Sequence, residues 1–500
     1  MAGCRPGVTA MSEAEAILER IAAAGVKVVD FRFTDLSGRW RHVARDAGTI
    51  DAEALTSGLL IDGSELPGWR DVTEADLLLR PDLGATWLDP FSAQPTLTVV
   101  CDGADPASGR GYERDPRSAA ERATAHLAAG KHADEVRVAV EVGFFLFDAV
   151  RLEHTPWSSG YGVAPTGGQG LAGGAGSFLA GPPADPFADI RTEIGSILGT
   201  LGVDGISHGH GRAVGQNELA LAPAPLIRAA DQIQALRYVT RMVAASYGKV
   251  ACFLAQPLPE APGSAMRISQ ALWRNERPIF FGQGYADLSP ICLQFVAGVM
   301  AHARALNAFT NPTTNSYRRL RYGRQEPTLL AYAARNRSTA LRIPYAARPD
   351  GKRVEVAFPD PSANPYLAFT AILMAGLDGI ERRLEPGDAA DRNLYDLPPE
   401  EASAFGTVCR SLDEALAALE ADHDFLTKDE VMPEELLEAY LRVKRQEMEQ
   451  VERLPHPAEF LLDGLSCGTG GPIGSCSSLS SSVFQACEGR VCLRRPWPVS

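Results

Sequence analysis

The sequence has no long hydrophobic run and no excess of positive charge. No uninterrupted apolar stretch among its 500 residues approaches the roughly 18–20 residues that a membrane-spanning helix needs. Lysine and arginine number 48 against 62 aspartate and glutamate residues, which gives a formal net charge of -14. Such an excess of acid disfavours binding to a nucleic acid or to an anionic membrane. These absences favour a soluble protein that acts on small molecules.

The sequence also shows no secretion signal, and its cysteines are unevenly distributed along the chain. The segment MAGCRPGVTAMSEAEAILER has no basic stretch followed by an apolar stretch and a cleavage site, so we expect a cytoplasmic protein. The apolar surroundings of Cys252 indicate a reduced, buried thiol. Four cysteines instead crowd the Gly/Ser-rich residues 467–500, at spacings that fit no common zinc pattern. We predict a disordered tail there, with a metal or redox site as the alternative.

The composition that is present, 45% hydrophobic and 22% charged, is that of a globular protein long enough for two or three domains. After an extension at 1–12, residues 13–113 predict a small α+β domain. It starts with a helix opened by Ser12 and Glu15, which form a capping-box pattern, and continues with a strand over 26–33. The Pro/Gly-rich segment ADPASGRGYERDPRS marks its end.

Residues 114–466 alternate helical patterns with short β-rich runs, which predicts a large α+β domain of catalytic size. Within it, residues 158–183 are rich in Gly, Ser and Pro and are predicted to form a mobile loop. Near its end, PEELLEAYLRVKRQEMEQVERL has Leu and Tyr at helical spacing and a charged outer face, which indicates a surface helix packed on the core.

Several of the short strands place polar residues in apolar surroundings. Glu141 lies within VAVEVGFFLF, and the next residue on the same strand face is Gly143. The segment ISHGHGRAVGQNELALAP predicts a hairpin that places His208 and His210 on one face, with Glu218 on the returning strand. Arg267 and Glu355 lie in two further strands, and arginines cluster in NSYRRL and ARNRSTALRIP. Acids, histidines and arginines in one cavity suit a divalent metal and an anionic substrate, although each alone is more often structural.

Longer motifs identify a family resemblance. NPTTNSYRRL, ARNRSTALRIP, FPDPSANPYLAFTAILMAGLDGI, GQNE, NLYDLPPEE, PHPAEF, FRFTDLSG and IDGSELPGW are similar to signature stretches of bacterial type I glutamine synthetase, in order over about residues 13–466. The resemblance implies an α+β chain with an N-terminal β-grasp domain at 13–113. It also implies a catalytic α/β domain with a curved antiparallel sheet at 114–466, and a dodecamer whose sites are completed between subunits.

The family holds two divalent cations, which bridge ATP phosphates so that glutamate can be phosphorylated and then attacked by ammonia. By resemblance, Glu141, Glu218 and Glu355 match metal ligands. The remaining ligand positions fall on Gly143, His210 and Arg267, of which only His210 could still bind a metal. A guanidinium stays protonated and repels a cation.

Other site positions are partly retained. By resemblance, Asp62 is the ammonium-site acid; His208, Gly263, Arg319 and Asn217 are substrate-binding; Arg337 and Arg342 contact phosphate, with Arg337 also catalytic. The departures are Gln325 at the flap acid, Ser177 at the ammonium-pocket tyrosine and Ala357 at a phosphate-directed arginine. Tyr395 in NLYDLPPEE matches the tyrosine that is modified by adenylylation, or it merely packs.

Four interpretations follow. The favoured one is an ATP-dependent carboxylate–amine ligase that uses ATP and Mg²⁺ or Mn²⁺ to join glutamate or a related carboxylate to an amine other than ammonia. Ordinary glutamine synthesis is the simplest alternative. Another is a pseudoenzyme that binds a small carboxylate or regulates a true synthetase within a mixed oligomer. The last is a single transition metal held by His208, His210 and Glu218 with Glu141 or Glu355.

Overall fold

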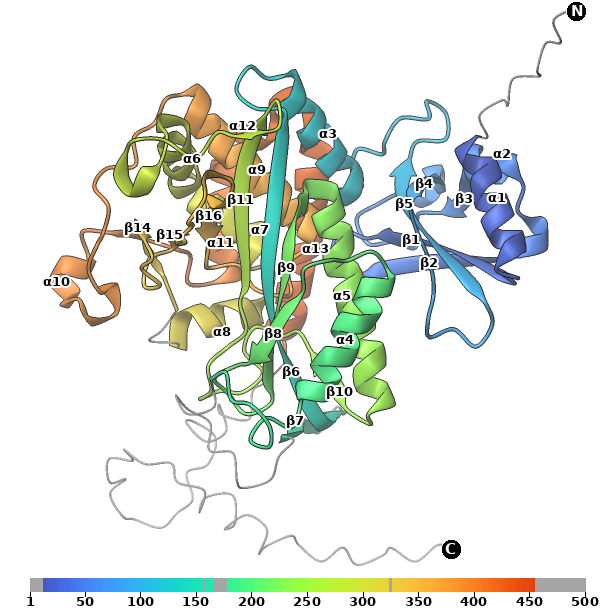
Figure 1. Ribbon diagram of the computed structural model, residues 1–500, viewed down its shortest axis with the longest axis horizontal. Helices are drawn as coiled ribbons and strands as arrows, with labels where there is room; N and C mark the ends of the chain where they lie inside the picture. The colour runs from blue at the N-terminus through green and yellow to red at the C-terminus, as the bar shows by residue number, and fades with distance from the viewer. Residues whose placement is uncertain (1–11, 156–157, 166–177, 323–325, 455–500) are drawn as a thin grey trace, which may run out of the picture. The chain divides into compact units, whose positions relative to one another are not determined.

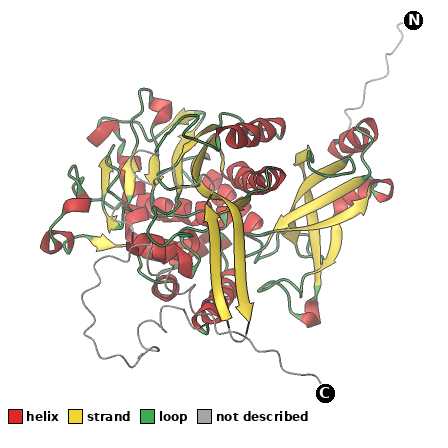
Figure 2. Cartoon of the chain, turned by 90° about the horizontal axis from the view of Figure 1, so that it is seen from below, coloured by secondary structure: helices red, strands yellow, loops and turns green. Residues whose placement is uncertain are grey.

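The computed structural model describes residues 12–155, 158–165, 178–322 and 326–454 (Figure 1). The predictions for Ser177, Gln325 and the tail at 467–500 therefore lie outside the described residues. Both parts of the fold combine helices with strands, as Figure 2 shows by colour. This is the α+β composition that the sequence predicts.

The amino-terminal part is built on a sheet of five strands in the order β2-β1-β5-β4-β3. Its strands are β1 (Val28–Thr34), β2 (Trp40–Asp46), β3 (Leu59–Asp62), β4 (Asp76–Leu88) and β5 (Thr96–Ala104). The first strand pairs antiparallel with β2 and parallel with β5, which gives a mixed sheet. Its helices are α1 (Glu13–Ala23) and α2 (Ala52–Ser57). The predicted capping box is present, since Ser12 Oγ accepts from Glu15 N at 3.2 Å and Ser12 N donates to Glu15 Oε2 at 2.8 Å.

A second, larger sheet forms the centre of the remaining chain. Its main path is β14-β15-β16-β11-β6-β9-β8, and all but the β14 and β15 pair run antiparallel along it. Figure 1 shows β6, β9 and β11 side by side. The strands are β6 (Glu135–Thr155), β7 (Ser158–Pro165), β8 (Ser207–His210), β9 (Gln216–Pro225), β10 (Val250–Cys252), β11 (Met266–Arg274), β12 (Arg277–Pro278), β14 (Tyr332–Ala334), β15 (Leu341–Ile343) and β16 (Val354–Val356). A separate pair is formed by β13 (Leu329–Leu330) and β17 (Gly406–Thr407).

The prediction of a loop over 158–183 is wrong at its start. Residues 158–165 form strand β7, which pairs with β6. Val163 packs against the buried rings of Phe145 and Phe147, so side-chain packing on β6 overrides the glycine-rich composition.

Helices pack against the central sheet around one very apolar helix, α9 (Pro365–Glu381). Every residue of α9 from Pro365 to Ile380 is buried. The final helix, α13 (Glu434–Glu452), buries Leu436, Leu437, Tyr440 and Val443, as predicted for a helix packed on the core. The other helices are α3 (Pro116–Ala129), α4 (Ala188–Thr200), α5 (Leu226–Ser246), α6 (Pro290–Ala301), α7 (Ala303–Thr310), α8 (Thr314–Tyr322), α10 (Pro399–Ala402), α11 (Leu412–Ala421) and α12 (Asp424–Thr427).

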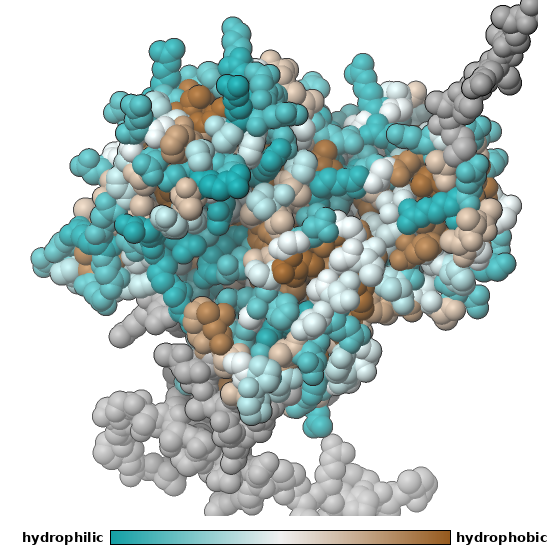
Figure 3. All heavy atoms as spheres, in the orientation of Figure 1, coloured by the Kyte–Doolittle hydropathy of each residue, from teal (hydrophilic) through white to brown (hydrophobic). Residues whose placement is uncertain are grey.

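Within the described ranges, no single helix is long and apolar enough to cross a membrane. The helices α6 and α7 reach that length only as a pair bent by 74°. On the face seen in Figure 3, hydrophobic residues lie in groups separated by hydrophilic ones. The described cysteines, Cys101, Cys252, Cys292 and Cys409, are all free thiols.

The break between α6 and α7 is held by His302. Its Nδ1 lies 2.8 Å from Asp422 Oδ2, its Nε2 lies 3.0 Å from Asp378 Oδ2, and its ring stacks on Phe425. Burial lowers the pKa of His302, but its hydrogen bonds with Asp422 and Asp378, together with their charges, outweigh burial and raise it. Lys428 and Arg382 also contact Asp378, which keeps that carboxyl ionised.

Replacing His302 with glutamine should remove a pH-dependent part of the stability. Because the folded pKa lies above the unfolded value of about 6.5, this contribution is complete below that pH and is lost as pH rises through the folded pKa. Urea unfolding at several pH values should show the largest difference between wild type and His302→Gln at the acid end. The exposed His132→Gln serves as the control; a difference that grew with rising pH would contradict the assignment.

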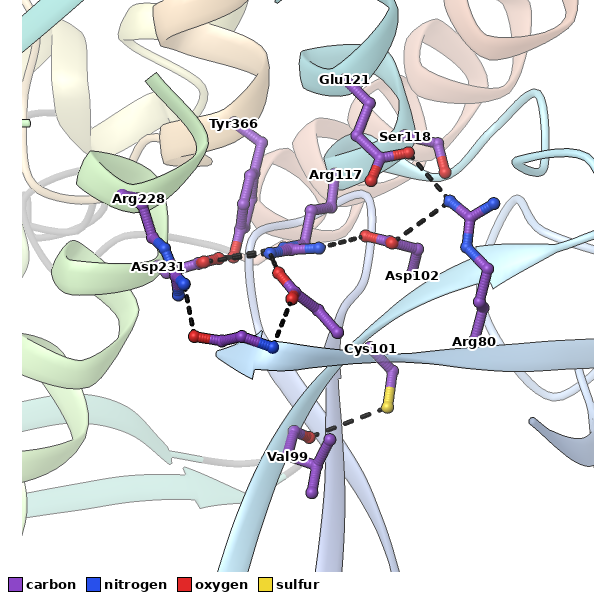
Figure 4. Close-up of polar contacts among 12 residues, drawn as sticks. Arg80, Val99, Cys101, Asp102, Arg117, Ser118, Glu121, Arg228, Asp231 and Tyr366 are labelled. Atoms are coloured by element: carbon purple, nitrogen blue, oxygen red, sulfur yellow. Dashed lines mark hydrogen bonds and ion pairs between the residues drawn. The ribbon is translucent and has the colours of Figure 1, made fainter. Parts of the chain in front are cut away.

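A buried ion network joins the amino-terminal sheet to the helices behind the central sheet (Figure 4). Arg117 on α3 contacts Asp82 at 2.5 Å, Asp102 at 2.6 Å and Asp231 at 3.0 Å. Tyr366 on α9 donates its hydroxyl to Asp231 at 2.5 Å. Because only 2% of the Arg117 side chain is exposed, these charges compensate each other away from water.

Candidate active site

The cavity is built on one face of the central sheet. In an antiparallel pair, residues directly opposite each other point to the same face. Glu141 on β6 lies opposite Arg267 on β11, Gly143 lies opposite Glu218 on β9, and Arg342 on β15 lies opposite Glu355 on β16. The side chains of five predicted residues and Gly143 therefore meet in one cavity of about 390 Å³.

Its described lining is Glu141, Gly143, Phe178, Leu179, Ser207, His208, Gly209, Arg212, Gln216, Glu218, Ala220, Pro262, Gly263, Ala265, Arg267, Glu326, Pro327, Arg337, Thr339, Arg342, Glu355, Ala357 and Tyr395. Six of these 23 residues are glycine or alanine, which leaves room beside the charged side chains.

Most of the cavity acids already have a guanidinium partner. Arg267 Nη1 donates to Glu141 Oε1. Arg342 contacts both carboxylate oxygens of Glu355. Its Nε lies 2.9 Å from Oε1, and its Nη2 donates to Oε2 at 3.0 Å. Glu326 is paired with Arg319. Since a guanidinium presents its donors in a fixed fork, such pairs bind carboxylates strongly.

Glu218 differs from the other acids. Among the described residues, no hydrogen bond or ion pair reaches its carboxylate. Burial and, next to it, the charge of Glu141 raise the pKa of Glu218 to about 7, while the charge of Arg267 opposes the shift. One acid of the cavity is therefore partly protonated near neutral pH.

The predicted ligand His210 lies on the other side of the hairpin from Glu218 and outside the cavity. His208 pairs with Leu219 and His210 with Asn217, whereas Glu218 pairs with Gly209, so His210 and Glu218 leave opposite faces. His210 is 1% exposed, stacks on Phe187 and is absent from the lining. Its Nδ1 lies 2.8 Å from the Gly211 carbonyl, while its buried Nε2 has no partner within the described structure.

His208 does line the cavity, and its Nδ1 accepts from Arg191 Nε at 3.4 Å. Burial and the charge of Arg191 both lower its pKa, so the ring is neutral at neutral pH. The set of His208, His210 and Glu218 that the sequence suggested for a transition metal is not brought together. Nowhere in the described chain do three or more His, Cys, Asp or Glu side chains gather in a way that could hold a metal ion.

The other predicted residues divide into lining and supporting positions. Gly263, Arg337 and Ala357 line the cavity. Asn217 and Arg319 are fully buried and lie outside the lining. Asn217 Oδ1 accepts from Arg191 at 2.6 Å, and Arg319 donates to the Pro359 carbonyl at 3.2 Å, so both hold the wall.

Three further predicted positions have surroundings of their own: Asp62, Gly143 and Tyr395. Asp62 is exposed at the end of β3, accepts from Ser64, and does not line the cavity of its own chain. At Gly143 an added Cβ would lie 3.1 Å from Ser264 Cβ, so Ser264 would have to shift to admit a larger side chain there. Tyr395 is half-buried and donates its hydroxyl to the Arg337 carbonyl at 2.8 Å.

Sequence reasoning missed Glu326 and Gln216. Glu326 is the acid that holds Arg319. Gln216 fixes the hairpin turn, because its Oε1 accepts from Arg212 N and Ala213 N at 3.0 Å each and its Nε2 donates to the Gly263 carbonyl at 2.8 Å. The segment GQNE contains Gln216, so its motif was a usable signal, whereas Glu326 had none beyond its neighbour Gln325.

A mixed sheet of five strands and a larger, mainly antiparallel sheet, with a cavity that gathers arginines and glutamates, define a protein that handles anionic small molecules. Comparison with known proteins agrees with this class. Residues 113–462 match the catalytic domain of glutamine synthetase, and residues 25–106 match its β-grasp domain. The chain belongs to the type I glutamine synthetase family, and its relatives named glutamine synthetase are ATP-dependent ligases.

Relatives cover nearly the whole chain. Glutamine synthetase of Azorhizobium caulinodans is 43% identical over 463 residues, which is 90% of this chain and 99% of the relative. The 3-hydroxylaminophenol mutase of Cupriavidus pinatubonensis is also 43% identical, over 89% of this chain and 97% of its own. The cryoEM structure of Plasmodium falciparum glutamine synthetase has the same fold, with a TM-score of 0.81, 23% identity and coverage of 91% of this chain and 99% of that chain. The GmaS/ADP complex gives a TM-score of 0.78 and 27% identity, covering 89% of this chain and 98% of that chain.

Divalent metal use is general in this family, and the described cavity does not fit a pair of such ions. Hard divalent cations need several oxygen ligands free of other charges. Here Arg267 and Arg342 each occupy a carboxylate that would face the metal. The third strand acid, Glu218, has its pKa raised to about 7, which weakens it as an anionic ligand.

Proposed function

We propose that the protein is a carboxylate–amine ligase that uses ATP to activate glutamate or a related carboxylate and then joins it to an amine larger than ammonia. The observation that carries this proposal is the cluster of Arg267, Arg337 and Arg342 in one cavity with the strand acids. Guanidinium groups bind phosphate and carboxylate oxygens through paired hydrogen bonds. The cavity thus has the donors that an acyl phosphate requires.

Arginine side chains, and Arg267 above all, supply positive charge to this cavity. Arg267 lies on a central strand, is surrounded by Glu141, Glu218 and Glu355, and has its pKa raised by their charges against the effect of burial. It is therefore charged under all working conditions. We infer that Arg267 contributes the positive charge that a second divalent cation would give, and that the site binds fewer than two ions.

The larger amine is supported by the small residues of the lining and by the names of the relatives. Gly209, Ala220, Ala265 and Ala357 leave open space next to the arginines. A 43% identical relative is named a mutase, so a similar chain carries the name of a different reaction. GmaS was solved with ADP, so another similar chain binds a nucleotide. Members of the family form oligomers. Because Asp62 is exposed and does not line the cavity of its own chain, we propose that it acts in the site of a neighbouring copy. That copy belongs to a dodecamer of this chain alone or mixed with another synthetase subunit.

ADP release by the purified protein tests this function. With ATP, Mg²⁺ and glutamate, a panel of ammonium, alkylamines and aromatic amines should give the fastest release with a carbon-bearing amine. Arg342→Gln should lower that rate by about 100-fold or more, since a charged donor is lost, while the exposed Arg228→Gln should not. The fastest release with ammonium would contradict the choice of amine.

A second candidate, a binding protein without turnover, is favoured by the ion pairs that occupy Glu141, Glu326 and Glu355. Under this reading the arginines hold a small carboxylate and no phosphoryl transfer follows. Absence of ADP release with every amine, combined with measurable binding of glutamate, would replace the ligase proposal with this one.

A further inference from the structure

A second cavity, of about 1080 Å³, lies next to the candidate site. Arg337 and Tyr395 belong to the linings of both cavities. The rest of its lining comes from residues 285–287, 334–338, 343–345, 352 and 391–393. We call it the Arg335 cavity. The family motifs and the proposed reaction give roles to Arg337 and Tyr395, but they give none to the rest of this lining.

Two positive charges in the Arg335 cavity have no acidic partner. Arg335 and Arg337 are both exposed, and within the described residues neither guanidinium forms an ion pair with a carboxylate. The Arg337 side chain also forms a hydrogen bond with the Tyr395 side chain. The other basic residues are engaged. Lys352 donates to the Ala286 carbonyl at 2.6 Å and contacts Asp287 at 3.1 Å, and Arg392 pairs with Glu401. Two guanidinium groups without acids, on alternate residues of one loop, are suited to an anion.

The loop that carries these arginines is fixed in place. Asn336, between them, donates its side-chain amide to the carbonyls of Ala390 at 2.9 Å and Arg392 at 2.7 Å. Ser338 Oγ accepts from Leu394 N at 2.9 Å. Since these bonds join the two loops that line the cavity, the arginines project from a preorganised wall, which lowers the entropy cost of binding.

Aromatic rings complete the lining. The Tyr285 hydroxyl accepts from Ala334 N at 2.8 Å and donates to Asp391, so this ring is held. Tyr345 is 75% exposed, so the face of its ring is accessible to a ligand in the cavity. A flat, weakly polar face beside two cations suits an organic ion with a ring.

Backbone strain gathers at the same place. Arg335, Ala286 and Asp287 have φ values of 59°, 53° and 58°, in the left-handed region that non-glycine residues avoid. Such conformations persist where the surrounding structure enforces them, and they cluster at ligand sites.

We propose that the Arg335 cavity is a second small-molecule site, which binds a phosphate or carboxylate group attached to an aromatic ring. Arg335 and Arg337 bind the anionic group, and the ring lies against Tyr345. The inference is independent of the ligase activity. Because Arg337 faces both cavities, binding in one changes the affinity of the other, and by linkage the effect is reciprocal.

Calorimetric titration of the full chain with phenyl phosphate, benzoate and inorganic phosphate tests this site and separates the two anionic groups. Arg335→Gln, which affects only this cavity, should weaken phenyl phosphate binding by about 10-fold or more, the usual loss for a hydrogen bond to a charged group. Tyr345→Ala should weaken binding of phenyl phosphate but not of inorganic phosphate. Arg342→Gln, which changes only the candidate active site, should leave this binding intact.

Several outcomes would contradict the proposed second site or the class of its ligand. Unchanged affinity in Arg335→Gln, or a loss found only in Arg342→Gln, would place the anion in the active site and end the proposal. No binding to wild type would do the same, as expected if another copy of the chain covers the cavity. Equal effects of Tyr345→Ala on both phosphates would remove the aromatic ring from the ligand class.

Discussion

Replacing Arg117 with leucine should destabilise the protein by about 3–5 kcal/mol, because it leaves buried carboxylates without their cation. Arg117 is the only described cation within reach of both Asp102 and Asp231, and it also contacts Asp82. These acids come from β4, β5 and α5. Without the guanidinium, their negative charges would repel each other where the amino-terminal sheet meets the helices. Nearby, burial and the charge of Asp102 already raise the pKa of Asp115 and of Glu121 to about 7 each.

Urea unfolding followed by circular dichroism measures this loss. Arg228, drawn near the same network in Figure 4, is an exposed arginine that donates to the Gly84 carbonyl, so Arg228→Leu should change stability by less than about 0.5 kcal/mol. If Arg117→Leu does not fold, Tyr366→Phe gives the smaller test, since it removes one hydrogen bond to Asp231 and should cost about 1 kcal/mol. Wild-type stability in both variants would show that the network contributes nothing.

Replacing Arg267 with alanine should raise the affinity for Mn²⁺ by about 10-fold or more, because a fixed positive charge leaves the immediate surroundings of three acids. Arg267 pairs with Glu141, and its charge also acts on Glu218 and Glu355. Without it, Glu141 and Glu218 would face the cavity as unpaired carboxylates, which is the environment that a divalent cation neutralises.

Manganese titration by calorimetry or electron paramagnetic resonance reads out this change. The control is Arg274→Ala, which removes an exposed arginine from the end of the same strand, outside the cavity lining. The two variants change net charge equally, so a difference between them comes from the position of Arg267. Equal Mn²⁺ affinity in wild type and Arg267→Ala would contradict the inferred role of this guanidinium.

Much of the candidate site was predictable because strand periodicity fixes which residues share a face. The placement of Glu141 beside Gly143, the hairpin that brings Glu218 back, and the position of Arg267 all follow from a repeat of two residues. His210 shows the limit of that reasoning. Its face depends on hairpin register, and the turn begins after His210, which sets Asn217 rather than Glu218 opposite it.

Contacts between distant segments could not be predicted from the sequence. The pairing of Arg319 with Glu326 and the buried Arg117 network depend on how separate elements pack, and no local pattern encodes them. The strand at 158–165 was missed for a similar reason, since its composition suggests a loop while its contact with Phe145 and Phe147 makes it a strand. The Arg335 cavity likewise arises from segments that lie between residues 285 and 395 and are distant in the chain.

In this cavity, arginines form ion pairs with the acids that a pair of divalent cations would need as ligands. Manganese binding to the wild-type protein, counted per subunit in the presence of ADP and glutamate, tests it most directly. We expect fewer than two bound ions per subunit. Two tightly bound ions per subunit would contradict it, because Glu141 and Glu355 would then have to leave Arg267 and Arg342.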